Sequence, residues 1–303
     1  MNKKFLIFTP SYNENSGGAV VLHKLCHVLN ELGYESYVKP YSYSYEVKKN
    51  NWMRFIWRLL KWSLLTSIRD FKTNPVFSTP VFKGNTVGDD WIVIYPEVVF
   101  GNPLDAKNVV RWLLHQPGFH EGHYFYGKNE LYFKFNSGID DFHFHGSVTS
   151  SNELKVIHYP LEHYNLDGVA QKRAGTAYCL RKGRNKKILH DTTDSILIDG
   201  KSHAEVARIF KKVKRFISYD TYTAYSIFAV LCGCQSVVIP DDGVSIDEWY
   251  PNETDRYGIA YGFQNIEEAS KTACLVREHV RREEGKVKAN VAGFAEEAIR
   301  YFL

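Results

Sequence analysis

Residues 181–187, in the second half of the chain, carry five positive charges among seven residues and directly follow a β-rich run. An arginine guanidinium offers a planar fork of donors, and a lysine ammonium is a compact charge on a flexible stem, so the two together can hold a diphosphate. Arg181, Lys182 and Arg184 are therefore candidate phosphate ligands. The alternative is a charged loop that is simply solvated.

Asp220 and Thr221 lie between a β-rich run, 215–219, and an apolar run, 222–231. Short side chains that carry an oxygen cap helices by accepting hydrogen bonds from free N–H groups of the first turn. The pattern predicts a helix over 222–231 that is capped by this pair and ends at Gly233.

A capped helix N-terminus at the carboxyl edge of a parallel sheet is a place where α/β proteins bind anions. We therefore expect Thr221 and Thr223 to lie beside a bound phosphate and Asp220 to face the same site. Asp242, in the turn after the next predicted strand, 236–239, is a further candidate. The alternative is a plain βαβ unit without a ligand.

Gly17 and Gly18 stand between a predicted strand, 4–9, and a predicted helix, 19–32. Glycine permits backbone conformations that are closed to other residues and lets a ligand approach the main chain. The spacing is not GxGxxG, so a dinucleotide fingerprint is absent. A simple helix-start turn is the alternative.

Glu97 and His115 follow two further predicted strands, 90–95 and 109–114. Both positions lie at strand ends, on the edge of the sheet where α/β proteins bind ligands. Glu97 is a candidate on the acceptor side of a transfer site. His115 could be a catalytic base, an acceptor ligand or a capping residue.

Residues 215–240 resemble the donor-binding segment of the C-terminal domain of GT-B glycosyltransferases, especially the retaining kind. That segment has an acidic residue, seven further residues, a second acidic residue and then a glycine. With Gly233 on the family glycine, the first acidic position falls on Asp220 and the second on Phe228. The resemblance implies that Asp220 holds sugar hydroxyls or balances positive charge at the reacting carbon. It also implies that the acid that usually holds the nucleotide ribose is absent.

The same family resemblance extends to two loops. Gly17 and Gly18 resemble the family's first loop, which lies near the donor phosphates and the acceptor. Arg181, Lys182 and Arg184 are the nearest matches to the arginine and lysine that bind the donor pyrophosphate in that family.

The resemblance implies an α/β fold with two Rossmann-like domains facing across a cleft and a C-terminal helix that crosses back to the first domain. A length of 303 residues is enough for two such domains. We expect an acceptor-side domain over 1–165, with an insertion over about 41–90, and a donor-binding domain over 166–303. Residues 160–175 are the predicted linker, 154–158 a predicted strand, and Ser202 the predicted cap of a helix over 204–213.

Residues 51–69 combine apolar side chains at helical spacing with arginine, lysine and tryptophan. A basic amphipathic helix of this kind can lie in a membrane surface, and a helix packed on its own domain is the alternative.

The composition of the chain limits which classes of protein it can belong to. With 44% hydrophobic and 24% charged residues the chain is typical of globular proteins, and a net charge of +4 is too weak to argue for nucleic acid. Five scattered cysteines predict a reducing cytoplasm rather than a disulfide framework. His120, His123, His143 and His145 match no zinc signature, so neither a metal nor a cofactor is expected.

The predicted function is a metal-independent transfer of a sugar from a nucleotide-sugar donor to a glycan or lipid-linked acceptor, as in polysaccharide or lipopolysaccharide biosynthesis. We expect a cytoplasmic protein, which 51–69 would hold peripherally on the inner face of the membrane. One alternative is a sugar-nucleotide epimerase or a phosphorylase of the same architecture. The other is a non-catalytic glycan-binding or membrane scaffold protein.

Overall fold

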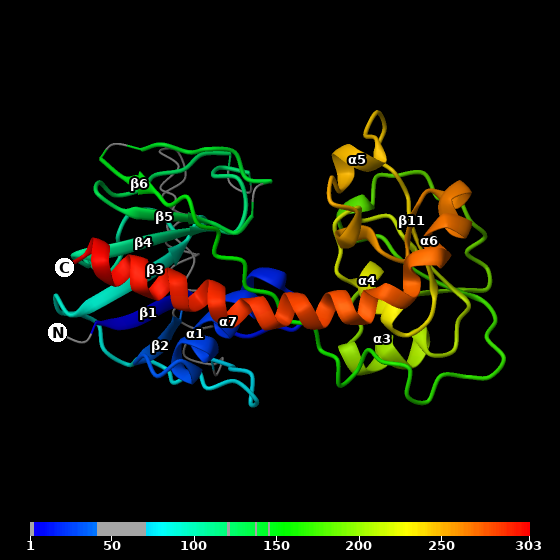
Figure 1. The fold of residues 1–303 in the computed structure, drawn as a ribbon, viewed down its shortest axis with the longest axis horizontal. Coiled ribbons are helices and arrows are strands. Elements are labelled where there is room, and N and C mark those ends of the chain that lie inside the picture. The colour runs from blue at the N-terminus through cyan, green and yellow to red at the C-terminus, as the bar shows by residue number, and fades with distance from the viewer. Residues whose placement is uncertain (1–2, 41–70, 120–121, 137, 145) are drawn as a thin grey trace, which may run out of the picture. The chain divides into compact units, whose positions relative to one another are not determined.

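The computed structural model describes residues 3–40, 71–119, 122–136, 138–144 and 146–303. The chain forms two compact units: the first comprises Met1–His158 with Gly285–Leu303, and the second comprises Tyr159–Glu284 (Figure 1). The units therefore divide at His158, rather than at the expected 165/166 boundary. The helix predicted over 51–69 and most of the predicted insertion lie outside the described residues.

The first unit is built on a six-stranded sheet in the order β2-β1-β3-β4-β5-β6, and every neighbouring pair is parallel. Its strands are β1 (Lys4–Thr9), β2 (Ser36–Pro40), β3 (Trp91–Pro96), β4 (Asn108–Leu113), β5 (Leu131–Lys134) and β6 (Val148–Thr149). The central strands are apolar along almost their whole length, because both faces of the sheet are covered. The strand predicted over 154–158 is wrong: the described residues there form no strand.

Among the described residues, one face of this sheet is covered by α1 (Gly17–Glu31) and by the C-terminal part of α7 (Val276–Tyr301). They pack against side chains such as Phe5, Trp112 and Phe133. The return of the last helix to the first unit, predicted from the sequence, is confirmed. On the opposite face, Leu6, Val93 and Tyr95 pack in a separate apolar cluster.

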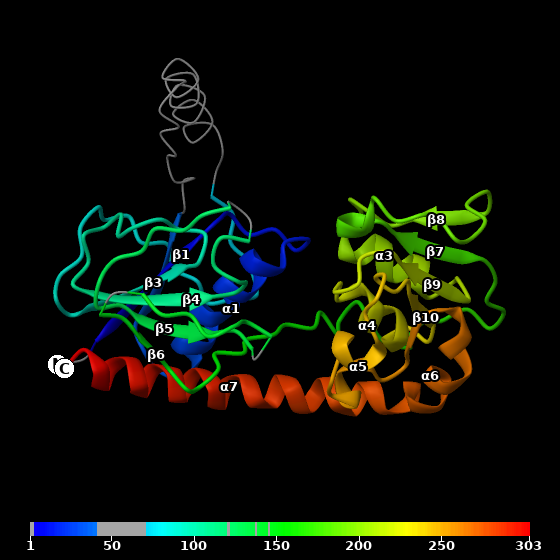
Figure 2. The ribbon, with the colours of Figure 1, turned by 90° about the horizontal axis from the view of Figure 1, so that it is seen from above.

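The second unit has a five-stranded parallel sheet in the order β11-β10-β9-β7-β8. Its strands are β7 (Thr176–Cys179), β8 (Ser195–Leu197), β9 (Arg215–Ser218), β10 (Gln235–Val238) and β11 (Ile259–Tyr261). Figure 2 shows β10, β9, β7 and β8 of this sheet side by side. Its helices are α3 (His203–Phe210), α4 (Tyr225–Leu231), α5 (Ile246–Trp249) and α6 (Ile266–Thr272). The predicted pair of α/β units with parallel sheets is thus confirmed.

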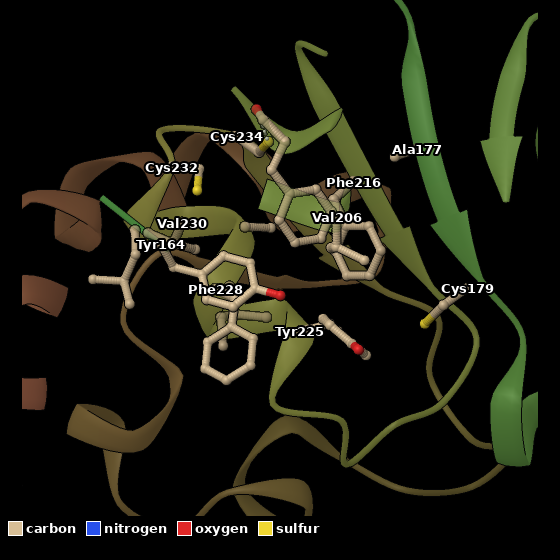
Figure 3. Packing of buried hydrophobic residues seen from close by; sticks show 14 of the residues in the cluster. Tyr164, Ala177, Cys179, Val206, Phe216, Tyr225, Phe228, Val230, Cys232 and Cys234 are labelled. Carbon is tan, nitrogen blue, oxygen red and sulfur yellow. Dashed lines mark hydrogen bonds between the residues drawn. The ribbon is translucent and has the colours of Figure 1, made fainter. Parts of the chain in front are cut away.

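The core of the second unit includes residues that precede its first strand. Tyr164 and Phe228 both belong to this core (Figure 3), and their rings stack with a centroid distance of 4.3 Å. The Tyr164 hydroxyl lies 2.6 Å from Nδ1 of His203. The predicted linker, 160–175, is therefore not a free connection, because its buried tyrosine is part of this core.

α4 begins later than the sequence predicts. Its N-cap is Ala224, which makes no side-chain capping bond, and the helix runs only from Tyr225 to Leu231. The prediction that Asp220 and Thr221 cap this helix is wrong, because both residues lie in the turn between β9 and the helix. Gly233 does stand at the stop of the helix, directly after the C-cap Cys232, and its φ of 78° is in the left-handed region that favours glycine.

Each sheet has a point at which the order of strands reverses. In the first unit the chain places β2 on one side of β1 and then β3 on the other. In the second it places β8 on one side of β7 and then β9 on the other. In open parallel sheets, ligands bind outside the carboxyl ends of the strands at such a switch point.

In the described part of the chain no helix is long and apolar enough to cross a membrane.

Candidate functional sites at the two switch points

The loop after β7 is held in a fixed shape at the switch point of the second sheet. The Asp199 carboxylate accepts a hydrogen bond from the backbone N–H of Arg181 at 2.9 Å. Arg181 itself has φ 42°, a left-handed conformation that is unusual for a residue with a Cβ. Two residues on, Gly183 lies against the Tyr219 carbonyl, where an added Cβ would come within 1.9 Å of the oxygen. The loop therefore needs glycine at this position.

This shape brings Arg181 to Asp220, which follows the neighbouring strand β9. Nε of Arg181 lies 3.8 Å from Oδ2 of Asp220, and the two side chains are 33% and 7% exposed. The guanidinium also lies over the Tyr225 ring, at 5.3 Å from its centroid. The other oxygen of Asp220 accepts from the backbone N–H of Tyr222 at 3.3 Å. A candidate phosphate ligand and the candidate catalytic carboxylate thus meet at the switch point.

A second ion pair lies at the carboxyl ends of the neighbouring strands β9 and β10. Nζ of Lys186 lies 2.6 Å from Oδ1 of Asp241, and it donates to Oγ1 of Thr221 at 3.0 Å and to the Ile239 carbonyl at 2.8 Å. The Thr221 hydroxyl donates to Oδ2 of Asp241 at 2.6 Å. Partial burial opposes the charge on Asp241, but the hydrogen bonds from Lys186 and Thr221 leave its pKa below the ordinary value.

Sequence reasoning did not single out Lys186 and Asp241. Each stands beside a residue of the same charge, Lys187 or Asp242, and charge alone does not show which member of a pair faces the strand ends. The signal that could have found Lys186 is its place inside the cationic run 181–187.

The other predicted ligands of the second unit lie around this network. Lys182, Arg184 and Asp242 are exposed on the same loops, whereas Thr221 is buried. Thr223 is half-buried, and its hydroxyl accepts from the backbone N–H of Tyr225 at 3.4 Å. Thr221 and Thr223 precede α4, so the prediction that they lie in the first turn of a helix is wrong, whereas their role as donor ligands stays a prediction.

The second acidic position of the family pattern carries a core residue. Phe228 is 4% exposed and stacks on Tyr164 inside the second unit. An acid at this position would be buried among aromatic rings, so no ribose ligand can come from it.

At the switch point of the first sheet, Gly17 and Gly18 are the first two residues of α1. The Ser16 side chain caps this helix by accepting from the Ala19 N–H at 3.5 Å. Neither glycine has a positive φ, so an unusual backbone is not the reason for their presence. They leave the helix start uncovered: an added Cβ on Gly17 would meet nothing within 4 Å, and one on Gly18 would lie 3.8 Å from Leu114.

Glu97 follows β3 and is 7% exposed. Its Oε2 accepts from the backbone N–H of Leu114 at 3.1 Å, and its carbonyl accepts from the Tyr126 hydroxyl at 2.8 Å. Burial raises the pKa of this carboxyl to about 7, against the smaller opposing effect of the backbone hydrogen bond.

Arg111, whose positive charge slightly lowers the pKa of Glu97, is engaged by other groups. Its guanidinium holds the Glu130 carboxylate through two hydrogen bonds of 2.9 and 2.7 Å, and it donates to the carbonyls of Val99 and Gly101 at 2.6 and 2.8 Å. Arg111 therefore fixes the loop that follows Glu97 without forming an ion pair with it. Within the described ranges, Glu97 has no ion-pair partner.

His115 lies next to Leu114 at the end of β4. Its Nδ1 accepts from the backbone N–H of Gln116 at 2.8 Å, and its ring stacks on Phe119 with a centroid distance of 3.8 Å. When Nδ1 accepts a hydrogen bond, the neutral ring carries its proton on Nε2. The role of His115 as a base, an acceptor ligand or a capping residue stays a prediction.

Metal-ligating clusters and disulfides play no part in the described sites. The described residues contain no group of three or more His, Cys, Asp or Glu side chains that could hold a metal ion. His120 and His145 lie outside the described residues. All five cysteines are free.

No protein-family model and no curated protein matches the chain. Among solved structures, the spinosyn forosaminyltransferase SpnP is 12% identical, with a TM-score of 0.37 over 99% of this chain and 96% of that one. CalG4, the calicheamicin glycosyltransferase, is 10% identical, with a TM-score of 0.38 over 99% and 98%. MurG of Acinetobacter baumannii is 10% identical, with a TM-score of 0.35 over 97% and 99%. At these TM-scores and identities the likenesses carry no weight for fold or function, which rest on the topology and contacts described above.

Proposed function

We propose that this protein is a glycosyltransferase of the GT-B kind, which transfers a sugar from a nucleotide-sugar donor to a hydroxyl acceptor without a metal ion. The second unit binds the donor and the first unit binds the acceptor. The acceptor is a glycan or a lipid-linked glycan, as in polysaccharide or lipopolysaccharide biosynthesis. Retention of configuration is what the resemblance to the retaining kind implies.

The observation that carries this proposal is the meeting of Arg181 and Asp220 at the switch point between β7 and β9. The two residues are far apart in the sequence, and two different loops bring them together. A guanidinium binds phosphate oxygens, and a buried carboxylate can stabilise positive charge on a sugar. A diphosphate-linked sugar contains both the negative group and the carbon that becomes positive as the bond to phosphate breaks.

The donor phosphates would compete with Asp220 and Asp241 for the cations that these carboxylates hold. Arg181 is the ligand we assign to the leaving phosphate, because its side chain is still 33% exposed. Lys186 is 20% exposed and holds Asp241 and Thr221, so it shapes the strand ends beside the phosphate. The exposed Lys182 and Arg184 add positive potential around them.

A panel of nucleotide sugars tests the proposal by thermal shift, because a ligand that binds the native state raises the melting temperature by mass action. The expected result is a rise with at least one nucleotide sugar and a smaller rise with the same nucleotide lacking the sugar. A donor that is epimerised or cleaved by phosphate without transfer would favour the epimerase or phosphorylase alternative. Binding without any turnover would favour the non-catalytic alternative.

The location at a membrane is a separate proposal, based on the sequence of 51–69 alone. Flotation with vesicles that contain anionic lipid tests it. We expect binding at low salt that weakens as added salt screens the charges, with a screening length of about 8 Å at physiological ionic strength. A protein that does not float with such vesicles at low salt would contradict the proposed membrane location.

A further inference from the structure

We propose that Tyr219 is a positioning residue for the donor: with His190 it latches the loop after β7 onto the end of β9, and the latch opens when His190 takes up a proton. The latch is the pair of hydrogen bonds that the Tyr219 hydroxyl makes with Leu189 and His190. The inference rests on the proposed function, because this loop carries Arg181 and Lys186.

Tyr219 attaches the loop after β7 at two points. Its side chain is fully buried directly after β9, and its hydroxyl accepts from the backbone N–H of Leu189 at 2.7 Å and lies 2.8 Å from Nδ1 of His190. Its backbone carbonyl lies against Gly183, where an added Cβ would clash with it. The two points stand before and after Lys186 in the sequence, so Tyr219 fixes the segment between them.

The rest of this loop has few contacts that would hold it in place. Residues 184–194 form no helix and no strand, and the side chains of Ile188 and Leu189 are exposed. Lys186 binds Asp241, but the donor phosphates would compete for that cation. Segments with few buried apolar contacts open locally at a low cost in free energy. The latch involves no group that the donor would displace, so it can keep the loop in place while the donor is bound.

The hydrogen bonds indicate which atom of the latch carries each proton. Burial raises the pKa of Tyr219, so its hydroxyl keeps its hydrogen near neutral pH. The oxygen accepts from the Leu189 N–H, and the hydroxyl hydrogen is satisfied when it points at Nδ1 of His190. His190 is then an acceptor at Nδ1 and carries its own proton on Nε2. Among the described residues, this Nε2 is buried and has no hydrogen-bond partner.

The charged form of His190 does not fit the latch, because a proton on Nδ1 would face the hydroxyl hydrogen. The described titratable groups around the ring are Tyr219, Asp191 and Tyr178, whose ring centroid lies 4.8 Å from that of His190. Burial lowers the pKa of His190 below the ordinary 6.5, and the Asp191 carboxylate opposes this shift only in part. The latch should therefore be closed near neutral pH and open as the pH falls below 6.5, through the pKa of His190 in the folded state.

Amide hydrogen exchange tests the latch in the full chain without a donor. At pH 7.5 the Leu189 N–H of the wild type should be protected, and its protection factor should fall by about fivefold or more in Tyr219→Phe, the equivalent of one hydrogen bond. The same fall should occur in the wild type at pH 5. His190→Asn can place an amide oxygen near the position of Nδ1 and does not titrate, so it should keep the protection at both pH values.

Donor affinity tests what the latch positions. Isothermal titration calorimetry uses the nucleotide sugar with the largest thermal shift, whose esterified phosphates carry the same charge at pH 7.5 and pH 5. We expect the wild type to bind it about fivefold or more weakly at pH 5. Tyr219→Phe should bind as weakly at pH 7.5 as the wild type does at pH 5, and His190→Asn should bind well at both. Tyr257→Phe, at a half-buried tyrosine of the same unit, is the control and should behave as the wild type.

The outcomes separate this proposal from the proposed function. An unchanged protection factor of Leu189 in Tyr219→Phe, or in the wild type between pH 7.5 and pH 5, overturns the latch whether or not a donor binds. A wild-type protein that binds no nucleotide sugar overturns the proposed function and the positioning role together. Affinity that weakens equally at pH 5 in the wild type and in His190→Asn overturns the role of His190. If Tyr219→Phe does not fold, the pH series of the wild type and of His190→Asn still decides, because a purely structural tyrosine gives no pH dependence that His190→Asn removes.

Discussion

At the scale of single residues, Asp220 is the side chain whose charge the proposed chemistry most needs. Its side chain is buried, and Arg181 is its ion-pair partner. We expect Asp220→Asn to keep a melting temperature near that of the wild type, because asparagine retains the shape and still accepts from the Tyr222 N–H. Transfer should fall by about 100-fold or more, the range seen when one electrostatic stabiliser is lost.

Rates and melting temperatures of purified wild type and Asp220→Asn check this prediction. Transfer at the wild-type rate would show that the carboxylate only organises the turn after β9. Loss of the fold would show that its ion pair with Arg181 is structural.

The raised pKa of Glu97 predicts how the stability of the protein depends on pH. Burial raises its pKa from the ordinary 4.5 to about 7, so the native state holds a proton that the unfolded state releases between these pH values. Stability should therefore fall as the pH rises from 4.5 to 7, by about 3 kcal/mol in total for this group. Glu97→Gln should lack that dependence. Denaturant unfolding at pH 5 and pH 8 measures it, and parallel pH profiles for the two proteins would contradict the raised pKa.

Sequence reasoning identified the types of residue that gather at the switch points but not which members of each group face inward. In 181–187 the cations look equivalent, yet the positive φ of Arg181 and the contact of Gly183 with Tyr219 turn Arg181 and Lys186 toward the strand ends. Lys182 and Arg184 remain exposed as a result. Such selection depends on contacts with a distant strand, which local sequence does not encode.

At the scale of elements, Lys186 links the loop after β7 to the ends of β9 and β10. It reaches Asp241, Thr221 and the Ile239 carbonyl at hydrogen-bond distance. We expect Lys186→Met to lower the free energy of unfolding by about 1–2 kcal/mol, after allowance for partial exposure. Donor binding should weaken too. Lys187→Met, at an exposed neighbour, is the matched control. It should change neither the free energy of unfolding nor the affinity for the donor. Equal denaturation midpoints for the two variants would remove Lys186 from this structural role.

Gly183 fixes how closely the same loop lies against β9. A Cβ on Gly183 would stand 1.9 Å from the Tyr219 carbonyl oxygen, so Gly183→Ala must displace the loop. The expected cost is about 1–3 kcal/mol, with loss of donor binding because Arg181 moves away from Asp220. Gly285→Ala is the control: it lies in α7 with nothing within 4 Å of the added Cβ, and alanine should stabilise that helix. Thermal unfolding of the two variants, with and without donor, measures both effects. A melting temperature of Gly183→Ala equal to that of the wild type would contradict the close contact.

The helices show where sequence patterns succeed. Ser202 caps α3 as predicted and forms a full capping box with Glu205, because both members of that motif are local. For α4 the same reasoning fails. The buried Thr221 and Asp220 are engaged by Asp241 and Arg181, which are distant in sequence, and the helix starts only at Tyr225. Tertiary contacts of this kind override the local capping preference of the sequence.

At the scale of the whole molecule, one helix belongs to both units. α7 places Val276 and Val280 in the core of the second unit, and Val291 and Phe294 in the core of the first. The family resemblance led us to expect this return, since the amphipathic pattern of a long charged helix does not show which unit it packs on. The two sets of candidate residues lie in different units, so each ligand can be tested separately.

The affinity of the donor nucleotide for the second unit tests the proposed function most directly. Isothermal titration calorimetry of the best nucleotide sugar would compare the wild type with Arg181→Ala and with the exposed neighbour Lys182→Ala. We predict that Arg181→Ala weakens binding by about 1.5–3 kcal/mol, or roughly 10- to 150-fold, because a charge-assisted bond to phosphate is lost. Lys182→Ala should have a smaller effect. Unchanged affinity in Arg181→Ala, or a wild-type protein that binds no nucleotide sugar, would contradict a donor site between β7 and β9.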